Sequence, residues 1–369
     1  MKISNVTLTL FAWKVPPGLR PGSRLAPRYG SGEIAAVTIS TDEGIDGHAF
    51  LGSATRSARN EAPALLHYLK PVIMGQNPLD IGRLWQGMWR NNQQVSLRCI
   101  GALDVALWDI AGKVMKQPIH RLLGTCREKV PAYASSAYLP TPQDYADEAL
   151  ELKSKGWQAY KIHPHSHPAK DIEICRAVRK AVGDDYTLML DSVWAYGYED
   201  ALRVGRAIEE LNFLWYEDPL PMDDIYNYVK LKQKLDIPIL ATEYAPGGLY
   251  GLSQWVLQGA TDMLRGDVSV KAGITSLMKI AHMAEAFRMK CEIHHGGNSL
   301  MNVANLNATM AISNCDWFEV LLPDVTNKYG LVRDIEIDKE GFVYAPVGPG
   351  LGYDIDWELV KKNTTQILQ

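Results

Sequence analysis

From residue 130 onward, short apolar runs alternate with amphipathic stretches of helical period, and this alternation occurs eight times. Because the runs are apolar throughout, they predict parallel strands that are buried on both faces. Eight such β/α units predict a closed (β/α)8 barrel of the TIM type. The eight expected strands are VPAYASS (130–136), AYKIH (159–163), YTLML (186–190), FLWYE (213–217), IPILAT (237–242), MLRGD (263–267), KCEIH (290–294) and DWFEV (316–320).

An α+β module is expected before the barrel, over residues 1–125. Residues 2–12 and 34–51 alternate as antiparallel strands do, and residues 56–124 read as helices. We expect the barrel domain to span 126–334. The last segment, 335–369, is expected to return to the first module, because DIEIDKEGFVYAP has the pattern of a hairpin.

Composition narrows the class of partner. The chain has 369 residues, of which 47% are hydrophobic and 22% charged, as in soluble globular proteins. The net charge of -4, with both signs interspersed, favours a small-molecule partner over nucleic acid or a membrane surface. Neither a secretory signal nor an apolar run of about 18 residues is present, so a cytoplasmic protein is expected. Five scattered cysteines form no CxxC and fit neither a disulfide scaffold nor a zinc site.

Three carboxylates end successive expected strands. Asp191, Glu217 and Glu243 are 26 residues apart, which is one β/α unit each. A single acid after a strand is usually a helix cap or a solvated charge, but three in phase point to one place at the mouth of the barrel. Their mutual repulsion requires a cation, and an all-oxygen ligand set favours Mg2+, or Mn2+, over zinc.

Further polar residues lie at the same end of the expected barrel. Lys161 and His163 are two residues apart on the second strand and therefore point to the same side. Asp267 and His294 end the sixth and seventh strands, 27 residues apart. A carboxylate that fixes one imidazole nitrogen raises the basicity of the other, so this pair is a candidate general base. Glu319 lies in the eighth strand, whereas His165 and His167 are expected in a loop.

These residues together indicate a reaction class. A carboxylate substrate held at the metal could lose its α-proton to a nearby base, and the cation would stabilise the resulting enediolate.

The motifs GALDVALWDIAGK, MLDSVWAY, WYEDP, ATEY and DVSVKAGIT, taken together, resemble the mandelate racemase subgroup of the enolase superfamily over essentially the whole chain. The resemblance implies an N-terminal capping domain, a homo-oligomer, Mg2+ ligands Asp191, Glu217 and Glu243, and a catalytic Asp267–His294 dyad. It also places Lys161 and His163 in a Lys-x-Lys position and implies that Glu319 hydrogen-bonds the substrate carboxylate. Two positions differ from the family pattern: His163 stands for the second lysine, and Val193 for a frequent asparagine.

The resulting hypothesis is dehydration of a sugar acid, an aldonate or an aldarate, to a 2-keto-3-deoxy acid. The alternatives are a racemase, epimerase or cycloisomerase of a hydroxy or sugar acid, and a non-catalytic binding barrel, which the full ring of charged residues disfavours. Arg20, Arg24 and Arg28, in the loop of residues 16–32, could close over a polyol and bind its hydroxyls or a distal carboxylate; the alternative is that they are solvated. Other polar residues near the expected site have simpler roles. Asp218 is expected to orient Lys161 or a ligand, His295 to be a loop histidine, and Lys271 to be a helix-start or surface residue. His48, Trp194 and Tyr244 are candidates for the pocket wall.

Overall fold

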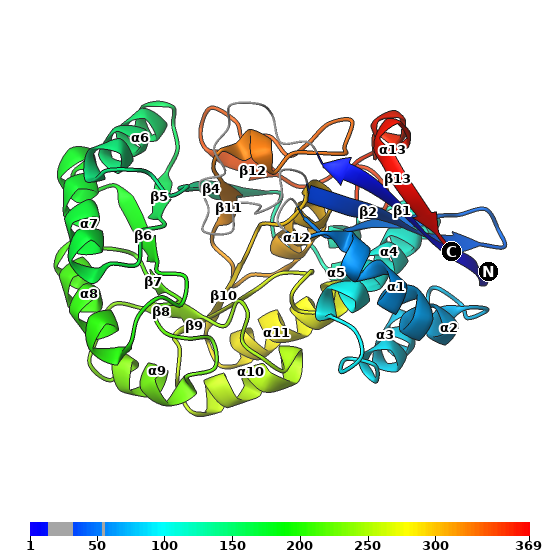
Figure 1. Cartoon of the computed structure of the whole chain (residues 1–369), viewed down its shortest axis with the longest axis horizontal. Helices are drawn as coiled ribbons and strands as arrows, with labels where there is room; N and C mark the ends of the chain where they lie inside the picture. The colour runs from blue at the N-terminus through cyan, green and yellow to red at the C-terminus, as the bar shows by residue number, and fades with distance from the viewer. Residues whose placement is uncertain (14–31, 54–55) are drawn as a thin grey trace.

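The protein consists of a barrel and a smaller N-terminal module packed against it (Figure 1). A computed structural model describes residues 1–13, 32–53 and 56–369. The loop arginines Arg20, Arg24 and Arg28 lie outside these residues. No helix in the described ranges is long and apolar enough to cross a membrane.

Eight parallel strands confirm the predicted barrel. They are β4 (Lys129–Ser135), β5 (Ala159–Ile162), β6 (Thr187–Asp191), β7 (Tyr216–Glu217), β8 (Ile239–Ala241), β9 (Met263–Gly266), β10 (Lys290–Ile293) and β11 (Phe318–Leu321). Neighbours pair in chain order from β4 to β10, and β11 returns to pair with β4. No ladder joins β10 to β11 in the described part of the chain, so the ring is nearly closed.

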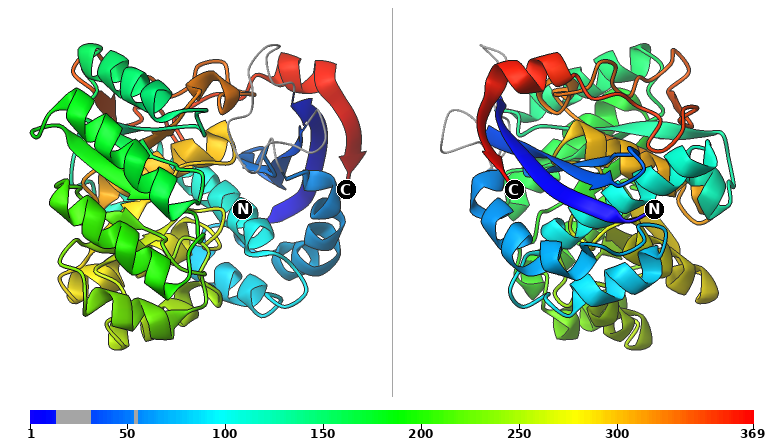
Figure 2. Two further views of the ribbon diagram at one scale, coloured as in Figure 1. Left: turned by 60° about the vertical axis from the view of Figure 1, so that its left-hand side comes forward. Right: turned by 90° about the vertical axis from the view of Figure 1, so that its right-hand side faces the viewer.

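Helices follow the strands and form the outer layer of the barrel (Figures 1 and 2). They are α6 (Pro142–Ser154), α7 (Pro168–Val182), α8 (Tyr198–Glu210), α9 (Ile225–Lys232), α10 (Gly248–Leu257), α11 (Ile274–Ala286) and α12 (Ser299–Ala311). Helix α6 shows why the sequence starts a helix there. The side chains of Thr141 and Asp144 each accept the other residue's backbone N–H. Pro142, at the first helical position, has no N–H that would need an acceptor.

Large side chains fill the interior of the barrel below its mouth. A separate buried cluster brings together one residue from each of five successive β/α units: Tyr133, Ala159, Met189, Trp215 and Leu240. This packed floor closes the barrel from below, as is usual for the fold. Polar side chains near the strand ends therefore face the mouth above it.

The N-terminal module is a four-stranded antiparallel sheet with helices on one side. The sheet order is β13-β1-β2-β3. The strands are β1 (Ile3–Trp13), β2 (Gly32–Thr41), β3 (Gly47–Leu51) and β13 (Thr364–Leu368), and the main helices are α3 (Ile81–Trp89), α4 (Leu97–Met115) and α5 (Ile119–Leu123). Shorter helical segments lie between residues 58 and 73, including α1 (Ala62–Ala64) and α2 (Lys70–Ile73). The division between residues 125 and 126 stays a prediction.

The end of the chain returns to the N-terminal sheet, but not through the segment that was expected to do so. Helix α13 (Trp357–Asn363) leads into β13, which pairs with β1. The hairpin prediction is wrong: β12 (Phe342–Tyr344) pairs with β4 of the barrel. The carboxylate of Asp338 accepts the N–H groups of Glu340 and Phe342, both at 2.9 Å, so the chain turns there without a first strand.

Buried side chains hold the module on the barrel. The Trp85 indole donates to the carbonyl of Ala272 at 2.7 Å, and Asp104 accepts from the backbone N–H of Thr275 at 2.9 Å. The Asn298 amide donates to the carbonyl of Gly52 at 2.8 Å. These contacts place the loop that follows β3 beside the β10–α12 loop at the mouth of the barrel.

Candidate active site and metal centre

The three predicted carboxylates converge. Asp191 ends β6 and pairs in register with Glu217, which ends β7, and Glu243 lies two residues after β8. Each offers an oxygen within 4.8 Å of the others, and all three side chains are buried. A divalent cation could take one oxygen from each, because carboxylate oxygens are the ligands that hard cations prefer.

Lys161 lies among these carboxylates. Its Nζ is 2.9 Å from Glu217, 2.7 Å from Glu319 and 3.5 Å from Asp191. Burial and the nearby Arg265 oppose its charge, but Glu217 and Glu319 outweigh them and raise the pKa of Lys161 well above its usual value. The ammonium group of Lys161 thus lies where it can stabilise negative charge at the cluster.

Arg265 is a site residue that the sequence argument missed. It is fully buried, with Nε 2.6 Å from Glu217 and Nη2 in contact with Glu319 and 3.2 Å from the Tyr133 hydroxyl. The sequence could have indicated this residue, because Arg265 lies two positions before Asp267 and alternate residues of a strand point to the same face. Lys161 and Arg265 thus offset part of the repulsion among the carboxylates, which was expected to require a metal ion alone. Burial nevertheless raises the pKa of Glu217 to about 7.

The predicted Asp267–His294 pair is formed. His294 Nδ1 lies 2.5 Å from Asp267 Oδ2, and Asp267 Oδ1 accepts the N–H groups of Ser269 and Val270. These bonds fix the orientation of the imidazole, whose Nε2 lies 3.3 Å from Glu243. Burial opposes the imidazolium, but Glu243 and Asp267 raise the pKa of His294 to about 9. Nε2 thus faces the cluster of three carboxylates through Glu243.

His163 lies on the opposite flank of the carboxylates. Its Nδ1 is 2.8 Å from the carbonyl of Ser136, and its Nε2 is 2.9 Å from Asp191. Both ring nitrogens therefore have protein partners. Each histidine thus directs Nε2 at one carboxylate of the cluster, His163 at Asp191 and His294 at Glu243. They differ at Nδ1, whose partner is a backbone carbonyl for His163 and the Asp267 carboxylate for His294.

Glu319 is held as a carboxylate. It contacts Lys161 and Arg265 and accepts the backbone N–H of His295 at 3.1 Å. Burial opposes this charge, but Arg265 and Lys161 hold the pKa of Glu319 well below its usual value. A hydrogen bond from Glu319 to a substrate carboxylate would need the protonated form, which these neighbours disfavour, so that role stays a prediction.

Strained backbone surrounds the carboxylates. Val193 and Trp194 have φ values of 49° and 57°, Asp218 has 40° and Thr242 has 89°. A β-branched residue such as Val193 rarely adopts this region, whereas asparagine tolerates it. Such strain typically marks functional sites. The strained residues follow Asp191 and Glu217 and precede Glu243. Trp194 packs against Tyr244, with ring centroids 5.3 Å apart.

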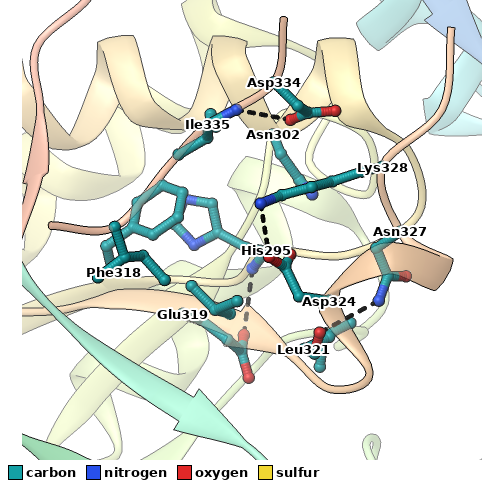
Figure 3. Close-up of a pocket in the computed structure, with 12 residues that line it drawn as sticks. His295, Asn302, Phe318, Glu319, Leu321, Asp324, Asn327, Lys328, Asp334 and Ile335 are labelled. Carbon is teal, nitrogen blue, oxygen red and sulfur yellow. Dashed lines mark hydrogen bonds and ion pairs between the residues drawn. The ribbon is translucent and has the colours of Figure 1, made fainter. Parts of the chain in front are cut away.

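His295 lines a small pocket together with Phe318 and Glu319 (Figure 3). Its ring packs on Phe318 with centroids 3.9 Å apart, and neither ring nitrogen has a partner in the described ranges. Burial lowers the pKa of His295 to about 3, so the ring is neutral. The polar residues that line the pocket also include Asn302, Asp324, Lys328 and Asp334. His295 is thus a buried residue outside the metal site.

The remaining interpretations have different outcomes. His165 and His167 are exposed loop residues, as predicted. Lys271 is 1% exposed, so its interpretation as a surface residue is wrong.

Asp218 makes no hydrogen bond or ion pair with Lys161 within the described chain, and its Oδ2 is buried without a partner. His48 packs against Trp357 in the N-terminal module and is not a pocket residue.

Comparisons with known proteins agree with this geometry. A family model described as "Enolase C-terminal domain-like" matches residues 144–359, and one described as "Mandelate racemase / muconate lactonizing enzyme, N-terminal domain" matches residues 11–124. The chain is 30% identical to the arabinonate dehydratase of Saccharolobus solfataricus, over 88% of each chain. It is 27% identical to the D-galactarolactone cycloisomerase of Agrobacterium fabrum, over 96% of this chain and 97% of that one.

Solved structures show the same similarity. The crystal structure of D-glucarate dehydratase from Agrobacterium tumefaciens complexed with magnesium matches with a TM-score of 0.86 and 31% identity. The match covers 99% of this chain and all of that one.

Proposed function

The chain belongs to the mandelate racemase/muconate lactonizing enzyme family of the enolase superfamily, and from this membership we propose that it is a Mg2+-dependent sugar-acid dehydratase. The enzyme removes the proton α to a carboxylate and eliminates the β-hydroxyl, giving a 2-keto-3-deoxy acid after tautomerisation. The observation that carries the proposal is the buried Asp191–Glu217–Glu243 cluster with the His294–Asp267 pair directly beside it.

The residues fit a divalent cation. Three carboxylate oxygens from three strands approach one point, and neither sulfur nor imidazole is part of the set, so Asp191, Glu217 and Glu243 would hold Mg2+ or Mn2+. A cation bound there would orient the substrate carboxylate and stabilise the negative charge that develops when the α-proton leaves. The magnesium in the D-glucarate dehydratase structure supports this choice of metal.

The general base in the proposal is His294. Asp267 accepts the Nδ1–H of His294 at 2.5 Å, which leaves Nε2 as the nitrogen that takes the proton. A cation held by Glu243 would offset the carboxylate charge that raises the pKa of His294, and Nε2 would then be unprotonated more readily. The Nδ1 partner of His163 is a neutral carbonyl, which supports a proton on Nε2 less than the Asp267 carboxylate does in His294. Lys161 is held as an ammonium by three carboxylates. Lys161 then stabilises the oxyanion side of the reaction, and His163 keeps Asp191 in place.

The elimination step needs an acid. After His294 takes the α-proton, its imidazolium can return that proton to the departing β-hydroxyl, which leaves as water. The C–H electron pair becomes the new C=C bond, and the resulting enol tautomerises to the 2-keto acid. Atoms and charge balance without any oxidant.

A substrate screen tests the proposal. The purified protein with Mg2+ should release a 2-keto acid from at least one member of a panel of aldonic and aldaric acids, detected as its semicarbazone. The matched control is the same protein after chelation of divalent metals, which should give no product. Absence of product from the whole panel would contradict the dehydratase assignment.

The second candidate is racemisation, epimerisation or cycloisomerisation. His163 at Asp191 and His294 at Glu243 flank the cluster from two sides, an arrangement that suits proton removal on one face and return on the other. The cycloisomerase relative supports keeping this candidate. Exchange of the α-hydrogen for deuterium in D2O, without loss of a hydroxyl, would favour it over dehydration.

A further inference from the structure

Two arginines from the N-terminal module lie over the mouth of the barrel. The Arg56 and Arg98 guanidinium carbons are 5.4 and 5.6 Å from the centroid of the same ring, that of Tyr244. Tyr244 directly follows the ligand Glu243. Both cations are thus within cation–π distance of a residue at the edge of the metal centre.

The fold holds both arginines in this position. Arg98 is the second residue of α4, and the start of this helix lies against the loop after β8, where a Cβ on Gly248 would lie 3.2 Å from Leu97. Arg56 closes a turn in which Ser53 N–H donates to its carbonyl at 2.8 Å. The same loop is tied to the β10–α12 loop through Gly52 and Asn298.

Neither guanidinium has an ion-pair partner among the residues that the structure describes. No described carboxylate lies within ion-pair distance of Arg56 or Arg98, whereas Arg59, three residues after Arg56, is paired with Glu33. A cation in the first turn of a helix is also unfavourable with respect to the helix dipole, so the attraction that favours Arg98 here comes from outside its own helix. Burial opposes the charge of Asp267, but His294 and, more weakly, Arg98 lower its pKa, although Arg98 and Asp267 form no ion pair in the described chain. Two unpaired positive charges that share one ring repel each other unless an anion binds between them.

The neighbouring polar groups can donate hydrogen bonds. The Trp194 indole N–H is buried and has no partner in the described chain, and its ring packs on Tyr244. Arginine and tryptophan are donors only, which suits a group that only accepts. A carboxylate fits this requirement better than a hydroxyl, because its two oxygens match the fork of a guanidinium.

From this juxtaposition we infer that Arg56, Arg98 and Trp194 form a binding site for a second carboxylate, at the end of the substrate opposite the reacting one. The substrate class is therefore the aldarates, sugar acids with a carboxylate at each end. This inference rests on the proposed function, and it makes Arg56 and Arg98 specificity-determining residues.

Binding measurements test the inference without requiring turnover. The His294→Asn variant with Mg2+ is titrated calorimetrically with a six-carbon aldarate and with the aldonate that differs only in carrying CH2OH at C6. We expect the aldarate to bind about 100-fold more tightly, because the aldonate leaves the arginines unpaired. Adding Arg98→Met or Arg56→Met should remove most of this preference while changing aldonate affinity little. The matched control is Arg203→Met, which removes an exposed arginine of α8 and should change neither affinity.

Equal affinities for the two acids, or a preference that survives both arginine substitutions, would overturn the inference. Tighter binding of a 6-phosphoaldonate than of the aldarate would overturn the carboxylate assignment in favour of phosphate. These outcomes are independent of the substrate screen: if the wild-type protein turns over aldonates and aldarates equally, the dehydratase proposal stands and the aldarate inference fails.

Discussion

At the scale of single residues, the site depends on which charges have partners. Lys161 and Arg265 are both paired with Glu217 and Glu319, and His294 is paired with Asp267. Lys161 and Arg265 therefore stabilise negative charge in the site, whereas His294 is the group proposed to transfer a proton. His294 is the residue whose removal should affect the chemistry most directly.

Replacing His294 with asparagine should lower turnover about 10²- to 10⁴-fold, the usual contribution of a general base. Asparagine keeps a hydrogen-bond donor for Asp267, so the melting temperature and the far-ultraviolet circular dichroism should change little. Steady-state rates with the substrate found in the screen provide the measurement. Unchanged turnover would remove His294 from the mechanism and would favour a binding role for the barrel.

Lys271 carries a buried charge that the proposed reaction does not use. Its stem lies against Gly266, where a Cβ would meet the lysine Cγ at 2.6 Å, and its Nζ donates to the carbonyl of Ala245 at 3.3 Å. Burial lowers the pKa of Lys271 to about 8, although Asp267, Asp218 and Glu243 counteract it. Holding the ammonium in the folded state at pH 7 therefore costs roughly 3 kcal/mol relative to the unfolded chain.

Lys271→Met should consequently stabilise the protein by about 2 kcal/mol at pH 7. Between the folded pKa of about 8 and the unfolded value of 10.5 the unfolded chain binds more protons, so the wild type gains stability as pH rises and the advantage of the variant shrinks. Urea unfolding of both proteins from pH 7 to 10.5 measures the difference, with exposed Lys180→Met as control. A difference that does not change with pH would mean that burial does not lower the pKa of Lys271.

At the scale of secondary-structure elements, a side chain completes the barrel where two strands do not pair. Glu292 of β10 accepts the N–H groups of Asp316 at 2.9 Å and Trp317 at 3.2 Å, just before β11. Its carboxylate thus takes the place of a ladder between β10 and β11. This junction carries His294 on one side and Glu319 on the other, so its geometry affects the site.

Glu292→Ala should destabilise the protein by about 2–4 kcal/mol, because two buried backbone donors lose their acceptor. Glu292→Gln keeps one acceptor oxygen and should lose less. Denaturant unfolding compares the variants, and hydrogen exchange should show faster exchange of the Asp316 and Trp317 amides in Glu292→Ala. Equal stability of Glu292→Ala and the wild type would show that β10 and β11 are held together without this carboxylate.

At the scale of the whole molecule, the metal should act as a ligand of the folded state. Asp191, Glu217 and Glu243 come from three separate β/α units, so the unfolded chain has no such site. Mg2+ at 100 times its Kd should therefore raise the free energy of unfolding by about 2.7 kcal/mol. Thermal unfolding with and without Mg2+ measures this shift, which Asp191→Asn should reduce strongly. A wild type whose melting temperature is insensitive to Mg2+ and to Mn2+ would contradict the metal site.

The sequence by itself determined the barrel and the part of the site that follows from its period. Apolar runs at regular spacing predicted eight strands, and residues at the strand ends, such as Asp191 and His294, had to face one mouth because parallel strands share a direction. Only the tertiary structure decided how the charges pair across the barrel and between the modules. Arg265 contacts Glu319, and Arg98 contacts Tyr244, although the residues of each pair are far apart in the sequence. The periodicity of the sequence does not predict such contacts, because they depend on how the whole chain packs.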